Sequence, residues 1–513
     1  MKQKMNVVMV LADQLNANWL GCAGHPQALT PRLDAFAATG MRFDSAYCQN
    51  PICTPSRVSI LSGQYCHNHG YYGLSGPAPA KLDNLFRHFR RHGYRTAAYG
   101  KLHLPEAPRN WIADDVDEFG DTYETADGVF GESEFLDGLE RKGLRDLEDS
   151  WHNENNYGKP SIAIDAMPSQ LPLEETQEMW CVRKAMDFMQ QDHEQPFCIQ
   201  VAFQKPHHPL LPNERFWNLY PEDLDLPSTW DLSPETRPPH FQQRWEEWRE
   251  YQPEFGREGD SFEDFVRRSW RGTLACVSQI DYVFGQLLDF LKSSGLEENT
   301  IVVFGSDHGA YHGHYGILEK APGICSDAVC RVPMLWRVPG VTSAGKASRQ
   351  LVENVDMAPT LSSLCGLPSM EMADGCDISS LLAGSSDAVR EIAVTENVWS
   401  KALRWENWRF VHYQQKAFAG QDVGELYDIE NDPEETRNLY HDEERRELIE
   451  TCRRKLLEWL IETQRAVTTQ QTVKYENYPP YQKGARFTYP YCGDGLAPNC
   501  VQARHREGIG MYL

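Results

Sequence analysis

The sequence predicts an α/β protein built on a large, mixed but mostly parallel sheet that is flanked by helices. Three apolar, β-branched runs, at residues 6–12, 197–203 and 300–305, lack the polar alternation of a half-exposed strand. Such runs are typical of parallel strands that are covered on both faces. Helical patterns separate them along the chain, as expected for strands joined by crossover helices.

The expected helices have recognisable ends. Residues 31–39 begin with a proline and stop at Gly40, which suits a first helical position and a helix end. Residues 262–291 carry apolar residues at the spacing of one helix face. Further helices are expected at 83–92, 173–191 and 355–364, and further strands at 96–99 and 332–338.

Three regions differ in their pattern. We expect the α/β domain to span residues 1–385, because from about residue 391 the pattern changes to short alternating runs followed by a charged helix. Residues 386–465 are therefore expected to form a small α+β subdomain. Residues 466–513 are aromatic and proline-rich without a helical period. Such a tail cannot form a core alone, so we expect it to cover its own domain or reach a neighbouring subunit of a homo-oligomer.

Charge and composition disfavour two classes of partner. The 513 residues carry a formal net charge of -24, which disfavours nucleic acid and anionic membranes. No stretch approaches the roughly 20 apolar residues of a transmembrane helix, and the N-terminal apolar run is shorter than that of a signal peptide. The 14 scattered cysteines fit reduced thiols better than a disulfide framework. We therefore expect a cytoplasmic protein.

Ionisable side chains follow the ends of four predicted strands. Each has an ordinary explanation when taken singly, such as a carboxylate that caps the next turn. Together they are hard to explain as packing, because the carboxyl ends of parallel strands meet at the edge where ligands bind. The residues concerned are Asp13, Lys101, His103, His207, His208, Asp307 and His308.

Residues 51–63, P-I-C-T-P-S-R-V-S-I-L-S-G, predict a short helix with a cysteine at its mouth. Thr54 suits the N-cap, Pro55 the first helical position and Gly63 the end of the helix. The unpaired N–H groups and the dipole at such a helix start favour an anion. Cys53 is thus placed for chemistry on an anionic substrate, although a buried cysteine beside a helix cap is the simpler interpretation.

Two of the strand-end acids predict a metal site. Asp13 and Asp307, together with His308, would offer an oxygen-rich donor set that contains one nitrogen. Such a set suits Ca²⁺, Mg²⁺ or Mn²⁺, whereas a thiolate-rich zinc site is not indicated.

Several motifs resemble those of one family. The run C-T-P-S-R at 53–57, followed by V-S-I-L-S-G, resembles the first signature of the formylglycine-dependent sulfatases, which belong to the alkaline phosphatase superfamily. G-Y-R-T-A-A-Y-G-K-L-H at 93–103 resembles their second signature. The resemblance continues through S-D-H-G at Ser306, V-D-M-A-P-T-L at Val355 and G-E-L-Y-D at Gly424, so it covers about residues 5–465.

This resemblance implies an alkaline-phosphatase-like α/β sandwich and a sulfatase activity on a small sulfate monoester, either aryl or sugar. A formylglycine-generating or anaerobic sulfatase-maturating enzyme would oxidise Cys53 to formylglycine, whose hydrate supplies the nucleophile. One hydroxyl of this gem-diol would attack sulfur, and loss of a proton from the other would let the resulting hemiacetal expel sulfate.

The resemblance also implies roles for individual residues. One divalent metal, Ca²⁺ first with Mg²⁺ or Mn²⁺ as alternatives, would be held by Asp13, Gln14, Asp307, His308 and the residue formed from Cys53. Arg57 would hold the formylglycine, and Lys101 would bind it and the sulfate. His103 would act as base on the gem-diol, His207 would serve the leaving oxygen, and Lys320 would contact a sulfate oxygen.

Two departures leave alternatives open. Many sulfatases have a second aspartate where this chain has Gln14, and the related phosphonate monoester and phosphodiester hydrolases share the Asp-Gln pair. Those enzymes lack the Lys-x-His pair formed here by Lys101 and His103, which favours sulfate. Lys320 lies one residue farther from His314 than is usual. A non-catalytic, metal-dependent binding protein that keeps Cys53 as a thiol is a third interpretation.

Overall fold

The computed structural model describes residues 4–465, except 75, 80–81, 107–108, 128, 130, 148–165, 192–193, 256–258, 321–323 and 386. Its main sheet has eight strands in the order β5-β4-β6-β1-β7-β8-β2-β9. The bounds are β1 Asn6–Ala12, β2 Met41–Phe43, β4 Arg95–Gly100, β5 Glu118–Asp121, β6 Phe197–Ala202, β7 Thr300–Ser306, β8 Met334–Arg337 and β9 Lys346–Ser348.

Five of these strands, from β5 to β7, run parallel. Strand β8 runs antiparallel to both of its neighbours, β7 and β2, which makes the sheet mixed. Strand β1 lies between β6 and β7, and all seven of its residues are buried. The carboxyl ends of β1, β4, β6 and β7 therefore open onto one edge, as the sequence predicts.

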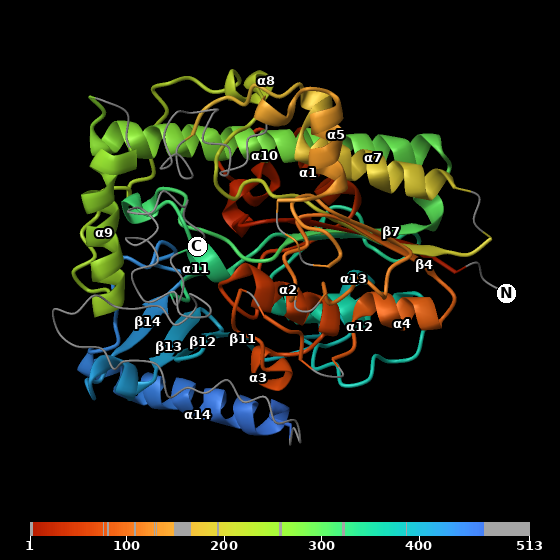
Figure 1. The fold of residues 1–513 in the computed structure, drawn as a ribbon. Helices are drawn as coiled ribbons and strands as arrows, with labels where there is room; N and C mark the ends of the chain where they lie inside the picture. The colour runs from red at the N-terminus through yellow and green to blue at the C-terminus, as the bar shows by residue number, and fades with distance from the viewer. Residues whose placement is uncertain are drawn as a thin grey trace.

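Helices cover both faces of the sheet (Figure 1). Val8 and Val10 of β1 pack in the core against one set of helices, whereas Val7, Met9 and Leu11 pack in the core against the other. This alternation follows from the two-residue period of a strand. The first set is α1 Pro31–Thr39, α7 Gln177–Gln190 and α10 Phe262–Ser293; the second is α2 Cys53–Ser62, α4 Leu85–Arg91 and α12 Met357–Leu364.

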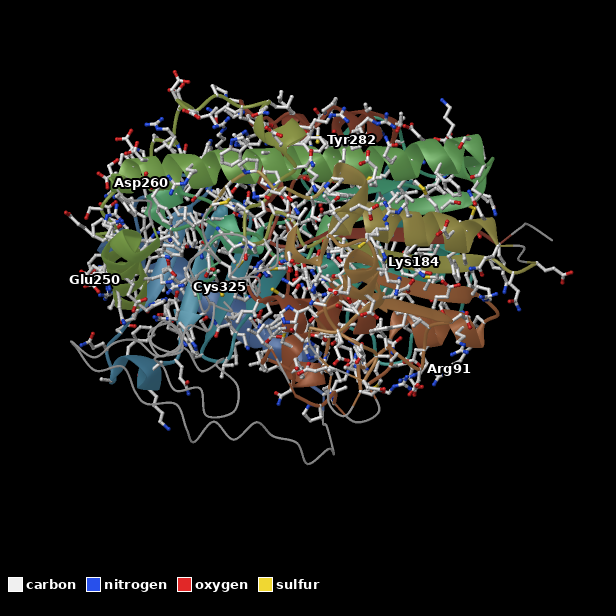
Figure 2. All side chains as sticks on the ribbon, turned by 45° about the horizontal axis from the view of Figure 1, so that its top comes forward. Arg91, Lys184, Glu250, Asp260, Tyr282 and Cys325 are labelled. Carbon is white, nitrogen blue, oxygen red and sulfur yellow. The ribbon has the colours of Figure 1, made fainter. Side chains whose placement is uncertain are left out.

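Helix α10 is the longest helix in the described part of the chain, with 32 residues. Ser261 and Asp264 form a reciprocal capping box at its start, which satisfies two backbone N–H groups. Figure 2 shows Tyr282 on this helix and Lys184 on the neighbouring α7, both on the outer layer. Cys325, in contrast, is buried.

A second, antiparallel sheet in the order β11-β12-β13-β14 packs against α14 near the C-terminal end of the described chain. Buried ion pairs of Arg237, in the segment before α10, join that segment to Glu425 and Glu435 of this unit. Arg409 of the sheet itself also pairs with Glu435. Breaking a buried pair is costly because one charge is left unpaired. The bounds are β11 Ile392–Glu396, β12 Ser400–Trp405, β13 Trp408–Tyr413, β14 Gly424–Asp428 and α14 Arg446–Thr463.

The predicted fold class, a mixed and mostly parallel α/β sandwich with a C-terminal α+β part, is confirmed. Several helix boundaries differ by a few residues from the predicted ones, and two of them have a clear local cause. Helix α4 begins at Leu85 because the Asn84 side chain accepts the N–H of Arg87, and the helix predicted at 173–191 is interrupted at Thr176, which is extended. The tail predicted at 466–513 lies outside the described residues. Among the helices in the described ranges, none combines the length and apolarity needed to cross a bilayer.

The described part of the chain has further α-helices and short strands outside the two sheets' main strands and the helices named above. They are β3 Ala46–Tyr47, β10 Val352–Glu353, α3 Cys66–His69, α5 Glu134–Arg141, α8 Glu214–Trp217, α9 Pro239–Phe255, α11 Asp327–Cys330 and α13 Ser379–Leu382.

Candidate active site

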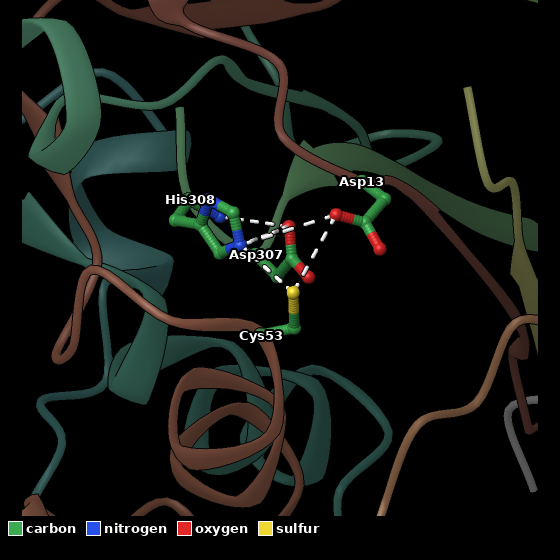
Figure 3. Close-up of side chains that lie close together, drawn as sticks. All are labelled: Asp13, Cys53, Asp307 and His308. Carbon is green, nitrogen blue, oxygen red and sulfur yellow. Dashed lines mark hydrogen bonds and ion pairs between the residues drawn. The ribbon is translucent and has the colours of Figure 1, made fainter. Parts of the chain in front are cut away.

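Four donor groups converge at the carboxyl edge of the sheet (Figure 3). Asp13 follows β1, and Asp307 and His308 follow β7, which is the next strand in the sheet. Cys53 is the first residue of α2. One donor atom from each of these four residues lies within 4.8 Å of the others, and all four residues are buried.

Cys53 lies at the start of α2, but the residue at the N-cap of this helix is not the one predicted. The N-cap is Ile52, which is extended and makes no side-chain cap, whereas Thr54 lies inside the helix and donates its hydroxyl to the Leu74 carbonyl. The prediction of Thr54 as N-cap was therefore wrong. Gly63 ends the helix in the left-handed conformation, as predicted.

The Cys53 thiol faces the polar cluster directly. Its Sγ lies 3.0 Å from His308 Nε2 and 3.7 Å from Asp13 Oδ1. A third group, the His103 side chain, also hydrogen-bonds to it. Burial lowers the pKa of His103, so this imidazole is held in the form that can accept a proton.

Two cations neutralise the two buried carboxylates. Arg57 Nε lies 2.8 Å from Asp307 Oδ2, and its Nη2 lies 3.3 Å from Asp13 Oδ2. Lys101 Nζ lies 2.6 Å from the same Asp13 oxygen. Burial would raise the pKa of Asp13, but Lys101, followed by His207 and Arg57, holds it well below its usual value. Asp13 is therefore a carboxylate at neutral pH.

His308 has one ring nitrogen fixed and the other facing the cluster. Its Nδ1–H donates to the Gly309 carbonyl at 2.8 Å, which leaves the Nε2 lone pair directed at Cys53 and Asp13. Metal-binding histidines commonly have their second nitrogen anchored in this way. Two carboxylates and one imidazole at this spacing fit a divalent cation that prefers oxygen ligands.

Gln14 joins the cluster through its backbone and its side chain. Its N–H donates to Asp307 Oδ1 at 3.1 Å, and its Oε1 accepts from Lys320 Nζ at 3.2 Å. Its carbonyl oxygen accepts from His312 Nε2 at 2.9 Å. The structure therefore brings Lys320 to the site in spite of its unusual spacing in the sequence.

His207 lies beside Lys320. Its Nδ1–H donates to the His208 carbonyl at 2.7 Å, and its Nε2 lies 3.2 Å from Lys320 Nζ. Burial, followed by the charges of Lys101 and Lys320, lowers the pKa of His207 well below its usual value. The adjacent His208 is buried, and neither of its ring nitrogens has a hydrogen-bond partner among the described residues.

Lys101 and His103 both reach the site from the segment that follows β4, which is not an extended strand. Strand β4 ends at Gly100, and His103 has a φ of 44°, in the left-handed region. The donor cluster of Asp13, Cys53, Asp307 and His308 is fully buried. Three other side chains of the site are partly exposed, namely those of Lys101, His103 and His207. The partly exposed side is therefore the one from which a substrate can enter.

Two supporting residues were not predicted. Asn354 Nδ2 donates to the carbonyl oxygens of Ser306 and Asp307, and Ser56 Oγ donates to the Asp307 carbonyl at 2.6 Å. These bonds fix the end of β7. Ser56 lies inside the C-T-P-S-R run and could have been singled out there, whereas nothing in the sequence around Asn354 marks it.

The carboxyl edge of an α/β sheet is where ligands bind, and the cations gathered here can stabilise negative charge on a bound substrate. Residues 5–367 match the family model described as Sulfatase, and residues 313–462 match that described as N-sulphoglucosamine sulphohydrolase, C-terminal. The chain therefore belongs to the sulfatase family, and it is a sulfuric ester hydrolase.

Individual relatives are distant. The chain is 26% identical to an arylsulfatase of Clostridium perfringens over 482 residues, which cover 89% of this chain and 94% of that protein. It is 26% identical to a choline-sulfatase of Rhizobium meliloti over 449 residues, which cover 85% and 82%. The solved structure of a phosphonate monoester hydrolase of Agrobacterium radiobacter has a TM-score of 0.73 at 21% identity and covers 90% of this chain and 96% of its own. This last likeness supports the predicted alkaline-phosphatase-like fold.

Replacing Arg57 by methionine is expected to destabilise the protein by about 3–5 kcal/mol, because two buried carboxylates lose a shared partner. Urea unfolding in the presence of EDTA measures the change in the free energy of unfolding. The matched control is Arg91→Met, which removes a largely exposed arginine paired with Asp83 and should cost less than about 1 kcal/mol. Equal costs for the two variants would contradict this account of the site.

Proposed function

We propose that the protein hydrolyses a small sulfate monoester, aryl or sugar, with a formylglycine formed from Cys53 and one divalent metal. The observation that carries this proposal is the position of Cys53. It begins a helix, faces two carboxylates and two imidazoles, and lies in the run C-T-P-S-R. A formylglycine here would supply, as its hydrate, a hydroxyl nucleophile that a thiol lacks.

The donor set fits a divalent metal held by Asp13, Gln14, Asp307, His308 and the modified residue 53. Ca²⁺ is the ion we propose, with Mg²⁺ or Mn²⁺ as alternatives, because carboxylate and amide oxygens dominate the set. A bound cation would supply positive charge that stabilises the sulfate oxygens and the nucleophile.

The cations of the chain would bind and orient the ester. Lys101 and Lys320 approach the cluster from different segments, one bound to Asp13 and the other to Gln14. Two ammonium groups around one sulfate would offset the negative charge that spreads over its oxygens. Arg57 lies on the same helix as residue 53 and keeps both carboxylates in place.

Two histidines are proposed to move protons. His103 contacts residue 53 and would take a proton from its hydroxyl. His207 has its Nδ1–H fixed by the His208 carbonyl, so Nε2 is the atom that would hand a proton to the leaving oxygen. Burial and then the charges of Lys101 and Lys320 oppose protonation of His207, and the negative charge of a bound ester would counter the two lysines.

The state of Cys53 is a direct test of the nucleophile. After co-expression with a sulfatase-maturating enzyme, the peptide containing residue 53 is expected to be about 18 Da lighter than its cysteine form, whereas ordinary thiol oxidation adds mass. Sulfatase activity should scale with the converted fraction. Cys53→Ala should abolish turnover and leave the unfolding midpoint near that of Cys22→Ala, the control at a cysteine away from the site. Normal turnover in Cys53→Ala would refute the mechanism.

Removal of the metal tests the donor set. EDTA is expected to abolish sulfatase activity, and Ca²⁺ should restore it. At a hundredfold excess over its dissociation constant, Ca²⁺ should also stabilise the folded protein by about 2.7 kcal/mol.

The stabilisation of the folded protein by Ca²⁺ should vanish in Asp307→Asn, because this variant loses a buried carboxylate donor. It should persist in Asp289→Asn, where the carboxylate is exposed, pairs with Arg32 and does not belong to the donor cluster. An unchanged response of Asp307→Asn to Ca²⁺ would exclude it as a ligand.

A phosphonate or phosphate diester hydrolase with the same nucleophile is the second candidate, and Gln14 is the residue that favours it. An amide in place of a carboxylate lowers the negative charge around the metal. We expect faster hydrolysis of an aryl sulfate than of the matching aryl phosphonate, because Lys101 and His103 are both present at the site. Rates on the two esters, with the same leaving phenol, decide the question. A clear preference for the phosphonate would reverse the assignment.

A further inference from the structure

Gln14 has a backbone conformation that glutamine rarely adopts. Its φ is 69°, in the left-handed region, and the residue is fully buried. A residue other than glycine keeps this conformation only where its surroundings impose it, and such residues are concentrated at active sites. Because Gln14 directly follows Asp13 at the end of β1, its backbone angles decide where its amide side chain points.

One segment, residues 307–320, binds Gln14 at three points. Asp307 Oδ1 accepts its N–H at 3.1 Å, His312 Nε2 donates to its carbonyl oxygen at 2.9 Å, and Lys320 Nζ donates to its side-chain Oε1 at 3.2 Å. The first two bonds hold the peptide groups on either side of the Gln14 Cα. They therefore restrain its backbone angles, whereas Lys320 holds the end of its side chain.

His312 is held in place by its own surroundings. It is 1% exposed, and its φ of 50° is also in the left-handed region. Its ring packs edge-on against Trp19, with 4.8 Å between the ring centres, and Trp19 packs in turn against Trp270 of α10 at 4.5 Å. Because the imidazole is already fixed, its hydrogen bond to Gln14 costs little further conformational entropy.

The turn that carries His312 also carries Lys320. The N–H of Tyr311 donates to the Glu319 carbonyl at 3.2 Å, so the residue before His312 is bonded to the residue before Lys320. This turn thus presents one donor to the main chain of Gln14 and another to its side chain. The two contacts depend on the same short piece of backbone.

We propose that His312 is a positioning residue, which holds Gln14 in the left-handed conformation in which its amide serves the metal site. This inference rests on the proposed function, in which Gln14 is a metal ligand, and it deepens that function by naming a residue outside the ligand set on which metal affinity depends. His312 would act through Gln14 alone.

The physical reason is that Gln14 must be kept in a conformation that its side chain disfavours. Loss of the His312 donor would leave the Gln14 carbonyl buried without this hydrogen bond, which is costly. Among the described residues, the remaining bond of that peptide group runs from the Leu15 N–H to Ser306 Oγ at 3.0 Å. The peptide group could then rotate toward an extended conformation, which glutamine prefers, and would carry the amide away from Lys320.

Calcium binding to the unmodified protein, measured by calorimetry, tests this role without any need for turnover. His312→Met removes the donor and keeps a buried side chain of similar length. It is expected to weaken Ca²⁺ binding by about tenfold to a hundredfold, as is usual when a group that orients a metal ligand is lost. An unchanged affinity in His312→Met would overturn the inference.

The conservative variant separates the hydrogen bond from the packing. His312→Gln has nearly the same length as His312→Met but keeps an N–H donor, so it should recover most of the Ca²⁺ affinity. Equal losses of affinity in the two variants would overturn the inference, because the ring and not its hydrogen bond would then be what matters.

A buried histidine on another pair of helices is the matched control. His88 of α4 is buried, and its Nε2 lies 2.7 Å from Ser362 Oγ of α12. His88→Met loses the same kind of hydrogen bond, so it should lower the midpoint of urea unfolding and leave the Ca²⁺ affinity unchanged. If it weakened Ca²⁺ binding as much as His312→Met does, the effect would be one of general stability and the inference would fall.

A double-mutant cycle shows whether His312 acts through Gln14. Gln14→Ala removes the side-chain donor and should itself weaken Ca²⁺ binding. Adding His312→Met should then cost little more, because the group to be positioned is already gone. Fully additive losses would overturn the inference, since His312 would then act on the metal site by another route.

Assays of the matured enzyme with 4-nitrophenyl sulfate separate this inference from the proposed function. Weaker Ca²⁺ binding in His312→Met, recovery in His312→Gln and no sulfatase activity in the wild type would leave the inference standing and refute the proposed function. Sulfatase activity in a wild type that binds Ca²⁺ no better than His312→Met would do the reverse. A wild type that binds none of Ca²⁺, Mg²⁺ and Mn²⁺ would overturn both.

Discussion

The site depends on the pairing of two buried carboxylates, Asp13 and Asp307, with the cations Arg57 and Lys101. Each partner comes from a different segment, so the pairing ties β1, β7, α2 and the end of β4 together at one edge. Charges at this depth are tolerated only when each has a partner. The same groups that let the sheet edge fold are therefore the groups that would hold a metal and bind a sulfate.

Much of this arrangement could be predicted from the sequence because apolar strands end abruptly in charged residues. Asp13, Asp307 and His308 follow runs that have only one plausible place in an α/β sheet, and that place fixes their neighbourhood. The N-cap of α2 was predicted wrongly because propensity favours Thr54, whereas the fold buries Thr54 and extends Ile52. The left-handed backbone of His103 is not predicted by any local pattern in the sequence.

The burial of Cys53 also bears on how long this residue would be accessible to a modifying enzyme during synthesis. Its side chain is 1% exposed once α2 is packed, and the His308 imidazole that closes over it lies 255 residues later in the chain. At a synthesis rate of about 5–20 residues per second, that closing segment emerges some tens of seconds after the cysteine. A maturating enzyme would have that interval in which residue 53 is still accessible. The yield of active protein would then depend on whether residue 53 is modified faster than the sheet is completed.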